Sequence, residues 1–416
     1  MTTDVDICLI TPGHVASTPR LVKSADALAE AGYAVHVVAG APFPPADRLD
    51  AEILSTAPWA YTGVKRRSGG GSFLRKAVRG VSRRLVQNSS LMWHGLVARA
   101  HHADAPCLVR LAAGVSARLY IGHGIAGLYA AAAAARIRGA VHGFDIEDYH
   151  DAETPEALTD PVERRIRFAL QSKLLPGCRT LTCAAPLIGE KYREVYHVDP
   201  TTLLNVFPLS QAPSEPPPPR AISEGDPAIF YWFSQTIGPG RGLEDVIKTM
   251  GFMRSPTELH LRGFVSPGYS EELQAAARAA GLKRPIRILE AGSPNEMSRL
   301  AASADIGLSV EHSLPLNKDI CLANKIFVYL LAGIPQLLSS TTAQRALAAE
   351  LSDAVILADM NRPRETAAQL DSFFSDPGRV ASARSSAWNL SRTRFNWDFE
   401  KEALVRLVHG VLPPSL

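Results

Sequence analysis

The chain has 416 residues, of which 46% are hydrophobic and 20% are charged. This length suggests two or three domains, and the composition excludes whole-chain disorder, collagen and coiled coil. The formal net charge of +3 hides an asymmetry, because residues 53–103 contain nine Lys or Arg residues and no Asp or Glu. That segment carries +9, and the other residues together carry −6.

The cysteines, the first residues and the most apolar run indicate the cellular compartment in which the protein is expected. The five cysteines are odd in number and form no paired Cys-x-x-Cys motifs, so neither a disulfide framework nor a structural zinc site is expected. The first residues lack the basic and apolar regions of a signal peptide. The most apolar run, residues 125–135, is too short to span a membrane and is predicted to be a packed helix. We expect a protein of the reducing cytoplasm.

The first half of the chain alternates predicted strands and helices. Residues 5–10 are typical of a buried strand, and a helix is expected to begin near Pro19 and to end at Gly32. Residues 34–39 form the next strand, which completes a parallel β-α-β unit. The alternation continues with strands at 119–123, 140–145 and 179–183 and helices at 124–135 and 160–173.

A proline-rich segment separates this half from a second half of the same type. Residues 208–226 include five prolines between positions 213 and 219 and are predicted to be a stiff linker. Beyond it, strands are expected at 228–233, 258–262, 286–289, 306–310 and 335–338, and helices at 243–250, 270–280, 295–302, 322–332 and 397–409. The fold class is therefore α/β. It comprises two doubly wound Rossmann-like domains, residues 1–207 and 227–394, and a C-terminal segment, residues 395–416.

In open parallel sheets, ligands bind at the carboxyl ends of the strands. Two such domains that face each other form a central cleft lined by these loops. His14 and His123 both follow predicted strands and are candidates for this cleft. The alternative for each is a hydrogen-bonded structural histidine.

An acidic cluster also ends a predicted strand. Asp145, Glu147 and Asp148 place three carboxylates within four positions, where they repel one another. A metal ion, a basic partner or solvent could compensate their charge. The alternative is an ordinary acidic helix N-terminus.

A glycine-rich segment follows the strand predicted at 228–233 and precedes a helix. Loop amides and a helix N-terminus together suit an anion such as phosphate. Ser234 and Thr236 add hydroxyl groups, Gly240 allows close approach, and Arg241 adds a bidentate cation. The alternative is an ordinary strand–helix turn. The segment is neither a P-loop nor a GxGxxG motif.

A second candidate phosphate site involves the helix predicted at 322–332. Glu311 ends the preceding strand, and Asn324 and Lys325 lie near the start of the helix. A diphosphate there would be held by the helix dipole and a cation together. The alternative for Lys325 is a solvated surface lysine.

Taken in order, these segments resemble the nucleotide-sugar-dependent glycosyltransferases of the GT-B fold, and most of all the retaining enzymes of family 4. The resemblance covers nearly the whole chain. It rests on the following segments: 18–20, 27–32, His123, 144–150, 234–243, 304–306, 324–325, 332–335 and 395–398.

The resemblance implies a role for each domain. The second domain would bind the nucleotide sugar, with Arg241, Asn324 and Lys325 near the diphosphate, and the first would bind the acceptor. His123 matches a histidine near the donor sugar, and Gly13 matches a loop that approaches the donor phosphate. In such enzymes the last helix crosses back to the first domain, and the leaving phosphate takes the acceptor proton. The metal-dependent class of glycosyltransferase would use a DxD motif, and the two-domain layout argues against that class. No metal or other cofactor is therefore expected.

The chain departs from the family pattern in two places. Many members carry two glutamates eight positions apart, but the matching positions here are Ile320 and Val328. Glu311 is the candidate to replace the first of them. An arginine usually found five positions before the Arg241 position is Thr236 here. Diphosphate binding would therefore depend on Arg241 and Lys325.

The basic segment contains a potential amphipathic helix at residues 73–85. Leu74, Val78, Val81 and Leu85 fall on one face, and Arg75, Lys76, Arg79 and Arg83 fall on the other. This pattern is typical of a helix at an anionic membrane surface. We expect those four basic residues to contact the membrane and the acceptor to be a lipid or lipid-linked glycan, which would make the protein peripheral on the inner face of the membrane. The alternative is a core helix with a basic outer face. Nucleic acid is disfavoured, because few aromatic residues accompany the charges.

Three other functions share parts of this pattern. A sugar-nucleotide epimerase or phosphorylase of the same fold would use the same cleft with different acid and base groups. A non-catalytic nucleotide-sugar-binding subunit would fit the missing glutamates. A nicotinamide dehydrogenase is disfavoured, because no GxGxxG motif follows the first strand.

Overall fold

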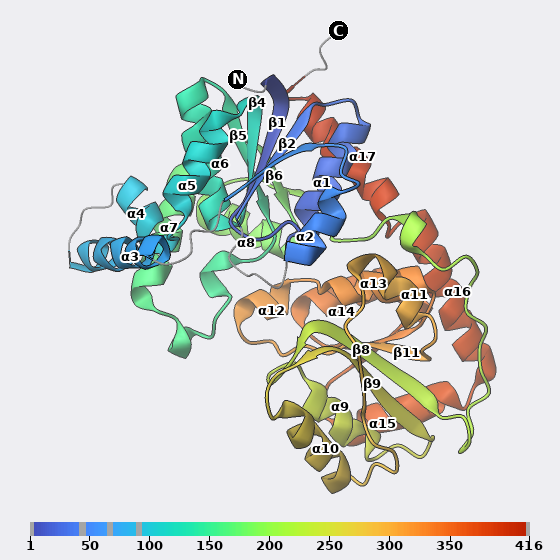
Figure 1. Cartoon of the computed structure of the whole chain (residues 1–416). Helices are drawn as coiled ribbons and strands as arrows, with labels where there is room; N and C mark the ends of the chain where they lie inside the picture. The colour runs from blue at the N-terminus through green and yellow to red at the C-terminus, as the bar shows by residue number, and fades with distance from the viewer. Residues whose placement is uncertain (1–3, 41–46, 65–69, 89–93, 413–416) are drawn as a thin grey trace. The chain divides into compact units, whose positions relative to one another are not determined.

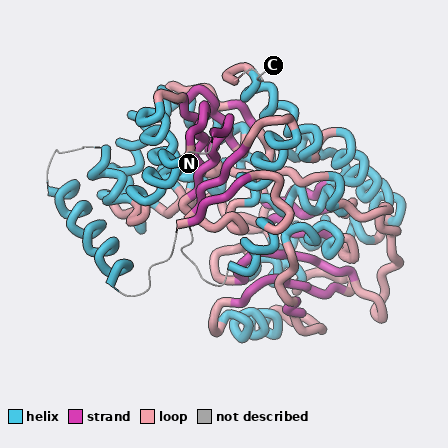
Figure 2. Tube along the Cα trace, turned by 45° about the horizontal axis from the view of Figure 1, so that its top comes forward, coloured by secondary structure: helices cyan, strands magenta, loops and turns pink. Residues whose placement is uncertain are grey.

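The computed structural model describes residues 4–40, 47–64, 70–88 and 94–412. The chain divides into two compact units (Figure 1). The first comprises Met1–Leu203 and Lys401–Leu416, and the second comprises Leu204–Glu400. Each unit contains its own parallel sheet with helices on both faces (Figure 2).

The first unit is built on seven strands in the order β3-β2-β1-β4-β5-β6-β7. The strands are β1 (Asp4–Thr11), β2 (Val35–Ala39), β3 (Ala60–Gly63), β4 (Ser116–His123), β5 (Val141–Ile146), β6 (Cys178–Cys183) and β7 (Thr201–Thr202). The helices are α1 (Pro19–Glu30), α2 (Asp47–Leu54), α3 (Gly70–Asn88), α4 (His94–His101), α5 (Ala105–Gly114), α6 (Gly124–Arg138), α7 (Pro161–Leu174) and α8 (Pro186–Tyr196). Its strand pairings are parallel, and the strand order reverses between β1 and β4.

The second unit repeats this plan with six strands in the order β10-β9-β8-β11-β12-β13. The strands are β8 (Ala228–Ile237), β9 (Thr257–Val265), β10 (Arg287–Leu289), β11 (Ile306–Ser309), β12 (Gln336–Ser339) and β13 (Val355–Ala358). The helices are α9 (Leu243–Met250), α10 (Tyr269–Ala279), α11 (Met297–Ala301), α12 (Leu316–Ile320), α13 (Asn324–Ala332), α14 (Thr342–Leu351), α15 (Pro363–Phe374) and α16 (Pro377–Thr393). Its order reverses between β8 and β11. The prediction of two doubly wound parallel sheets is therefore confirmed.

Helix α6 explains why the alanine-rich run is a packed helix. A Cβ atom on Gly122 would lie 2.4 Å from the backbone of Gly127, and one on Gly127 would lie 2.7 Å from the carbonyl oxygen of Ile10. Only glycine permits this approach of helix to sheet. Most of the alanines of α6 are buried. In the part of the chain that the structure describes, no helix is long and apolar enough to cross a membrane.

The proline-rich segment packs on the second unit. Arg220 binds Asp305 with a shortest distance of 2.5 Å, and Arg299 donates a hydrogen bond to the carbonyl oxygen of Ser210. The chain's final residues instead belong to the first unit. Lys401, in α17 (Trp397–His409), lies 2.8 Å from a carboxylate oxygen of Glu30 in α1.

Candidate functional site

In a doubly wound sheet, a crevice forms at the carboxyl ends of the strands where the strand order reverses. In the first unit this point lies between β1 and β4, and the loop after β1 carries Gly13 and His14. The His14 side chain is buried, and its Nδ1 atom lies 2.7 Å from Asp50 of α2. The other Asp50 oxygen accepts a hydrogen bond from the backbone of Ala16. The structural alternative for His14 is thus supported: it fastens α2 to the loop.

His123 ends β4 on the other side of the reversal. Its side chain is buried, and Nδ1 lies 3.3 Å from Glu147 Oε1 and 3.4 Å from Asp145 Oδ2. Carboxylates beside Nδ1 favour a proton on that nitrogen. Among the described residues Nε2 has no hydrogen-bond partner. His123 therefore presents, at the carboxyl end of β4, a buried ring nitrogen that has no partner among the described residues.

The Asp145 carboxylate is paired with Arg20 of α1. The guanidinium donates from Nε and Nη2 to the two carboxylate oxygens at 2.5 and 2.9 Å, and Thr182 also donates to the carboxylate. Burial alone would raise the pKa of Asp145, but the charges of Arg20 and His123 and these hydrogen bonds outweigh it and lower the pKa to about 2. Asp145 is therefore a carboxylate at neutral pH.

The pairing with Arg20 bears on how the charge of the acidic cluster, Asp145, Glu147 and Asp148, is compensated. For Asp145, the compensating group is a basic side chain of the same unit. His123, Asp145 and Glu147 also offer ligand atoms within 4.8 Å of one another, which is a set that could hold a divalent ion. Such an ion would compete with Arg20 for Asp145, because both carboxylate oxygens already accept from that guanidinium.

The second unit departs from expectation at its glycine-rich segment. The strand predicted to end at residue 233 continues as β8 to Ile237, with an irregular register between Phe233 and Thr236. Ser234 and Thr236 therefore lie in the strand, and the loop is confined to residues 238–242. The bulge was missed because it depends on β9, where Gly263 has φ +143° and a Cβ atom would lie 2.1 Å from the carbonyl oxygen of Ser234.

The remaining loop approaches the end of the neighbouring strand. Gly240 and Gly242 both have positive φ, and a Cβ atom on Gly242 would lie 3.1 Å from the carbonyl oxygen of Val310. Lys318 of α12 donates a hydrogen bond to the carbonyl oxygen of Gly240. Arg241 is partly exposed between the two glycines. The first turn of α9 contains Glu244 and Asp245, which oppose anion binding at that helix N-terminus.

The N-terminus of α13, unlike that of α9, has no acidic residue that would oppose anion binding. Its N-cap side chain makes no hydrogen bond. The exposed Asn324 accepts a hydrogen bond from Asn205. Lys325 is only 8% exposed, and its Nζ atom lies 3.1 Å from Glu311 and 5.3 Å from the centre of the Trp232 ring. It is therefore not the solvated lysine of the alternative interpretation.

Two hydrophobic residues occupy the positions that match the paired glutamates of the glycosyltransferases that the sequence resembles. Val328 and Ile320 are both buried, and Val328 belongs to a hydrophobic cluster with Tyr329 and Ala332. Glu311 follows β11, and its backbone N–H donates a hydrogen bond to the Oγ atom of Ser339. It is the acidic side chain that lies beside Lys325.

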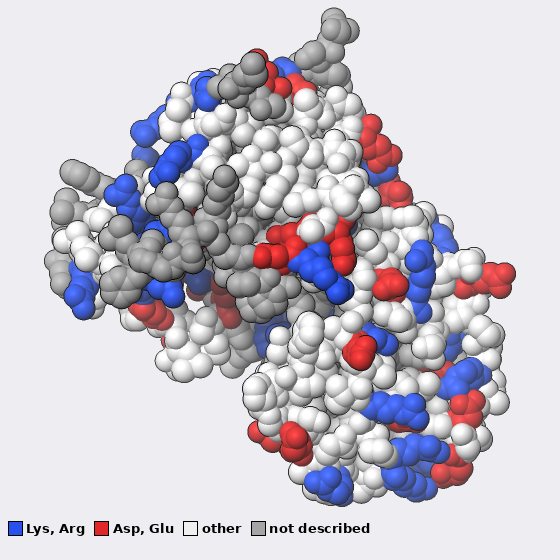
Figure 3. Space-filling model, viewed as in Figure 1, with Lys and Arg blue, Asp and Glu red and all other residues white. Residues whose placement is uncertain are grey.

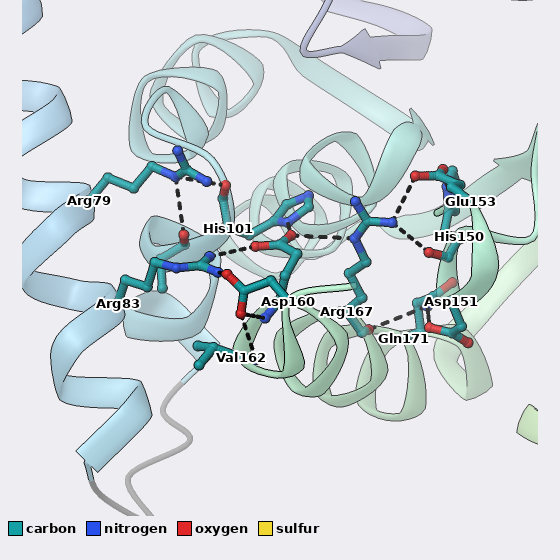
Figure 4. A network of polar contacts seen from close by, with 12 residues as sticks. Arg79, Arg83, His101, His150, Asp151, Glu153, Asp160, Val162, Arg167 and Gln171 are labelled. Carbon is teal, nitrogen blue, oxygen red and sulfur yellow. Dashed lines mark hydrogen bonds and ion pairs between the residues drawn. The ribbon is translucent and has the colours of Figure 1, made fainter. Parts of the chain in front are cut away.

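The basic segment is oriented differently from the expectation. Arg75 pairs with Asp104 at 2.6 Å, and Arg83 pairs with Glu163 at 2.7 Å and with Asp160. Arg79 donates to the carbonyl oxygens of two residues in α4. Figure 4 shows Arg79 and Arg83 turned toward α4 and α7. Arg75, Arg79 and Arg83 thus bind their own unit, whereas Lys76 is exposed and has no ion pair among the described residues.

Comparison with solved structures identifies the fold. HepE of Anabaena, solved with UDP and glucose, matches with a TM-score of 0.70 at 14% identity over 97% of this chain and 100% of its own. WaaG, a glycosyltransferase involved in lipopolysaccharide biosynthesis, matches with a TM-score of 0.58 at 13% identity over 98% and 100%. A putative UDP-N-acetylglucosamine 2-epimerase from Listeria monocytogenes matches with a TM-score of 0.55 at 11% identity over 97% and 96%.

The chain has the GT-B fold. No family profile matches its sequence, and no curated protein is similar to it in sequence. Gly13 and His14 follow β1, His123 ends β4, Arg241 follows β8 and Glu311 follows β11. Arg20 and Asp50 were missed as site residues, because only the tertiary fold brings each beside its partner.

Proposed function

We propose that this protein is a glycosyltransferase that moves a hexose from a nucleotide-sugar donor to an acceptor with retention of configuration. One observation carries the proposal: in the second unit, the α13 N-terminus with Lys325 lies beside β11 at the strand-order reversal of a GT-B fold. The complex of HepE with UDP and glucose supports a nucleotide-sugar donor. The donor's diphosphate would lie at this helix end, near Arg241.

The proposed chemistry requires no protein nucleophile. The bond between the anomeric carbon and the diphosphate oxygen breaks, and a bond forms from that carbon to the acceptor oxygen. The acceptor proton passes to the leaving phosphate on the same face of the sugar. The helix N-terminus, Arg241 and Lys325 would stabilise the charge that develops on the diphosphate. Because cationic side chains supply this role, we propose that no metal ion is needed.

The acceptor would bind to the first unit. Nε2 of His123 has no hydrogen-bond partner among the described residues and would bind a sugar or acceptor hydroxyl, while Glu147 and Asp145 hold its ring. Glu147 is about one-third exposed and could itself accept a hydrogen bond from the acceptor. We propose a lipid or lipid-linked glycan acceptor, a class that fits WaaG's part in lipopolysaccharide biosynthesis.

A thermal-shift screen tests the donor site. We expect a nucleoside diphosphate to raise the melting temperature of the wild type and Lys325→Ala to reduce that rise. Lys248→Ala, which changes an exposed lysine of α9, is the matched control. Equal rises in all three proteins would refute the assignment of Lys325. Release of nucleoside diphosphate from a panel of nucleotide sugars would then identify the donor.

A sugar-nucleotide epimerase is the second candidate, because the epimerase from Listeria matches over nearly the whole chain. The two activities differ in their products. An epimerase would convert a nucleotide sugar into its isomer without any acceptor, whereas a transferase would release the diphosphate only as the sugar moves. A non-catalytic subunit would bind donor but give neither product with any acceptor.

A further inference from the structure

Arg20 is a buried cation that has no part in the proposed glycosyl transfer. Figure 3 shows Lys and Arg side chains at the surface of both units, whereas Arg20 is only 3% exposed. Three of its nitrogens donate hydrogen bonds: Nε and Nη2 to the two oxygens of Asp145, and Nη1 to the carbonyl oxygen of Leu203. Removing a guanidinium from water is costly, so its presence here requires a physical reason.

Two carboxylates meet at one ring nitrogen of His123. Nδ1 of His123 and Oε1 of Glu147 form a hydrogen bond of 3.3 Å, and Oδ2 of Asp145 lies 3.4 Å from the same nitrogen. One ligand atom from each of these residues lies within 4.8 Å of the other two. Two negative charges at that separation repel each other. A nearby cation lowers the cost of keeping both carboxylates beside Nδ1.

Arg20 supplies such a cation. Burial would lower the pKa of the Arg20 guanidinium, but the charge of Asp145, its hydrogen bond and the charge of Glu147 raise the pKa above its ordinary value. The hydrogen bonds of Arg20 go to Asp145, and its electrostatic attraction extends to Glu147. It therefore reduces the negative charge that surrounds the ring nitrogen.

The two carboxylates differ in how firmly they are held. Asp145 lies within β5, its side chain is only 5% exposed, and Thr182 of β6 also donates to it. Glu147 follows β5, and its side chain is 34% exposed. Glu147 can rotate toward solvent at little cost, so its place beside His123 depends on the local balance of charge.

We propose that Arg20 is a positioning residue: its charge keeps the two carboxylates together at Nδ1 of His123, and they in turn fix the direction of Nε2. This role rests on the proposed function, in which Nε2 binds a hydroxyl group of the sugar or acceptor. Without Arg20, Glu147 would turn toward solvent, and the ring would lose the hydrogen bond that holds it. The alternative is a purely structural role, in which Arg20 fastens α1 to β5 and to Leu203.

Nitrogen NMR spectroscopy of the histidine rings tests the arrangement without any substrate. We expect the full-length wild type to show a slowly exchanging Nδ1–H signal, assigned by its absence from His123→Ala, and Arg20→Gln to lose it. Arg20→Gln/Glu147→Gln should regain the signal, because a neutral amide is not repelled by Asp145. This double variant also provides the test where Arg20→Gln alone fails to fold. Absence of the signal from the wild type, its survival in Arg20→Gln, or its absence from the double variant would overturn the proposal.

A double-variant cycle in kcat tests the consequence for turnover. We expect Arg20→Gln to lower kcat by about 10–100-fold with little change in the donor KM, the size of effect that a misplaced group produces. In a His123→Ala background the same change should lower kcat no further, because Arg20 acts through His123. Arg384→Gln removes another buried arginine, in the second unit, and should lower the melting temperature but not kcat.

Equal losses of kcat in both backgrounds would leave Arg20 with a structural role alone and overturn the proposal. A wild type without turnover, together with loss of the Nδ1–H signal in Arg20→Gln, would refute the glycosyltransferase function and confirm that Arg20 positions His123.

Discussion

The Arg20 guanidinium and the Asp145 carboxylate are joined by two hydrogen bonds of 2.5 and 2.9 Å, and both side chains are at most 5% exposed. Arg20 also donates to the carbonyl oxygen of Leu203, so it connects α1, β5 and the end of the first unit's main segment. Through Asp145 it sets the charge beside His123. This buried pair therefore links the stability of the first unit to its candidate site.

Removal of one partner should be far worse than removal of both. We expect Arg20→Leu to lower the free energy of unfolding by about 3–5 kcal/mol, because it leaves a buried carboxylate without a counter-charge. Arg20→Leu/Asp145→Asn should recover a substantial part of that loss. Urea unfolding of the first unit's signal would measure both. Additive losses would show that the two residues do not stabilise each other.

The low pKa of Asp145 predicts an acid-sensitive contribution to stability. The folded pKa of about 2 lies below the ordinary value of 3.8, so the unfolded chain binds the proton more readily. The contribution, about 2 kcal/mol, is complete above about pH 5 and is lost as the pH falls through the folded pKa of about 2. Asp145→Asn should therefore show a shallower loss of stability between pH 4 and 2 than the wild type. Parallel pH profiles in thermal melts would contradict the assignment.

Glu311 has two distinguishable roles, a counter-ion for Lys325 or a ligand for the donor's ribose. As a counter-ion, its removal frees Lys325, so Glu311→Gln should bind pyrophosphate and nucleoside diphosphate more tightly. It should also destabilise the apoprotein by about 1–3 kcal/mol. As a ribose ligand, its removal should weaken nucleoside diphosphate binding and leave pyrophosphate unchanged. The 3.1 Å contact with Lys325 leads us to expect the first result, and calorimetric titration of both ligands would decide.

His123 should affect turnover without affecting donor binding. We expect His123→Ala to lower kcat by about 10²–10⁴-fold, the range for loss of a positioned group at the reaction centre. The nucleoside diphosphate thermal shift should persist, because it reports on the second unit. His142→Gln is the control, since its Nε2 atom binds the carbonyl oxygen of Leu174 and makes no contact with the candidate site. Unchanged turnover in His123→Ala would remove it from the mechanism.

Gly263 should be irreplaceable for structural reasons. Its φ of +143° is closed to other residues, and a Cβ atom would collide with the carbonyl oxygen of Ser234 at 2.1 Å. We expect Gly263→Ala to cost about 3 kcal/mol or more and to weaken nucleotide binding by moving β8. Gly281→Ala has positive φ but open space around it, so it should cost only about 1–2 kcal/mol. Equal losses on thermal unfolding would show that the bulge tolerates a shift.

Local patterns predicted the parts of the fold that depend on neighbouring residues. Apolar runs such as residues 7–10, and the turns that follow them, identified the central strands β1, β4, β8 and β11. Because parallel strands direct their carboxyl ends to one edge, those assignments also placed His123, Glu311 and Lys325 at the correct edges of their sheets. The extension of β8 to Ile237 could not be predicted, since it requires a glycine of β9 facing the bulge.

The sequence by itself determined the two doubly wound sheets, because hydrophobic burial follows the spacing of apolar residues along the chain. It also supplied the amphipathic pattern of α3, but that pattern left the helix free to turn either face outward. Only the tertiary structure decided the question, by presenting Asp104, Asp160 and Glu163 where the arginines could bind them. The same holds for Arg20 and Asp145, which are 125 residues apart. Ion pairs form between charged groups that the fold brings together. The separation of two residues along the sequence does not give the distance between their side chains in space.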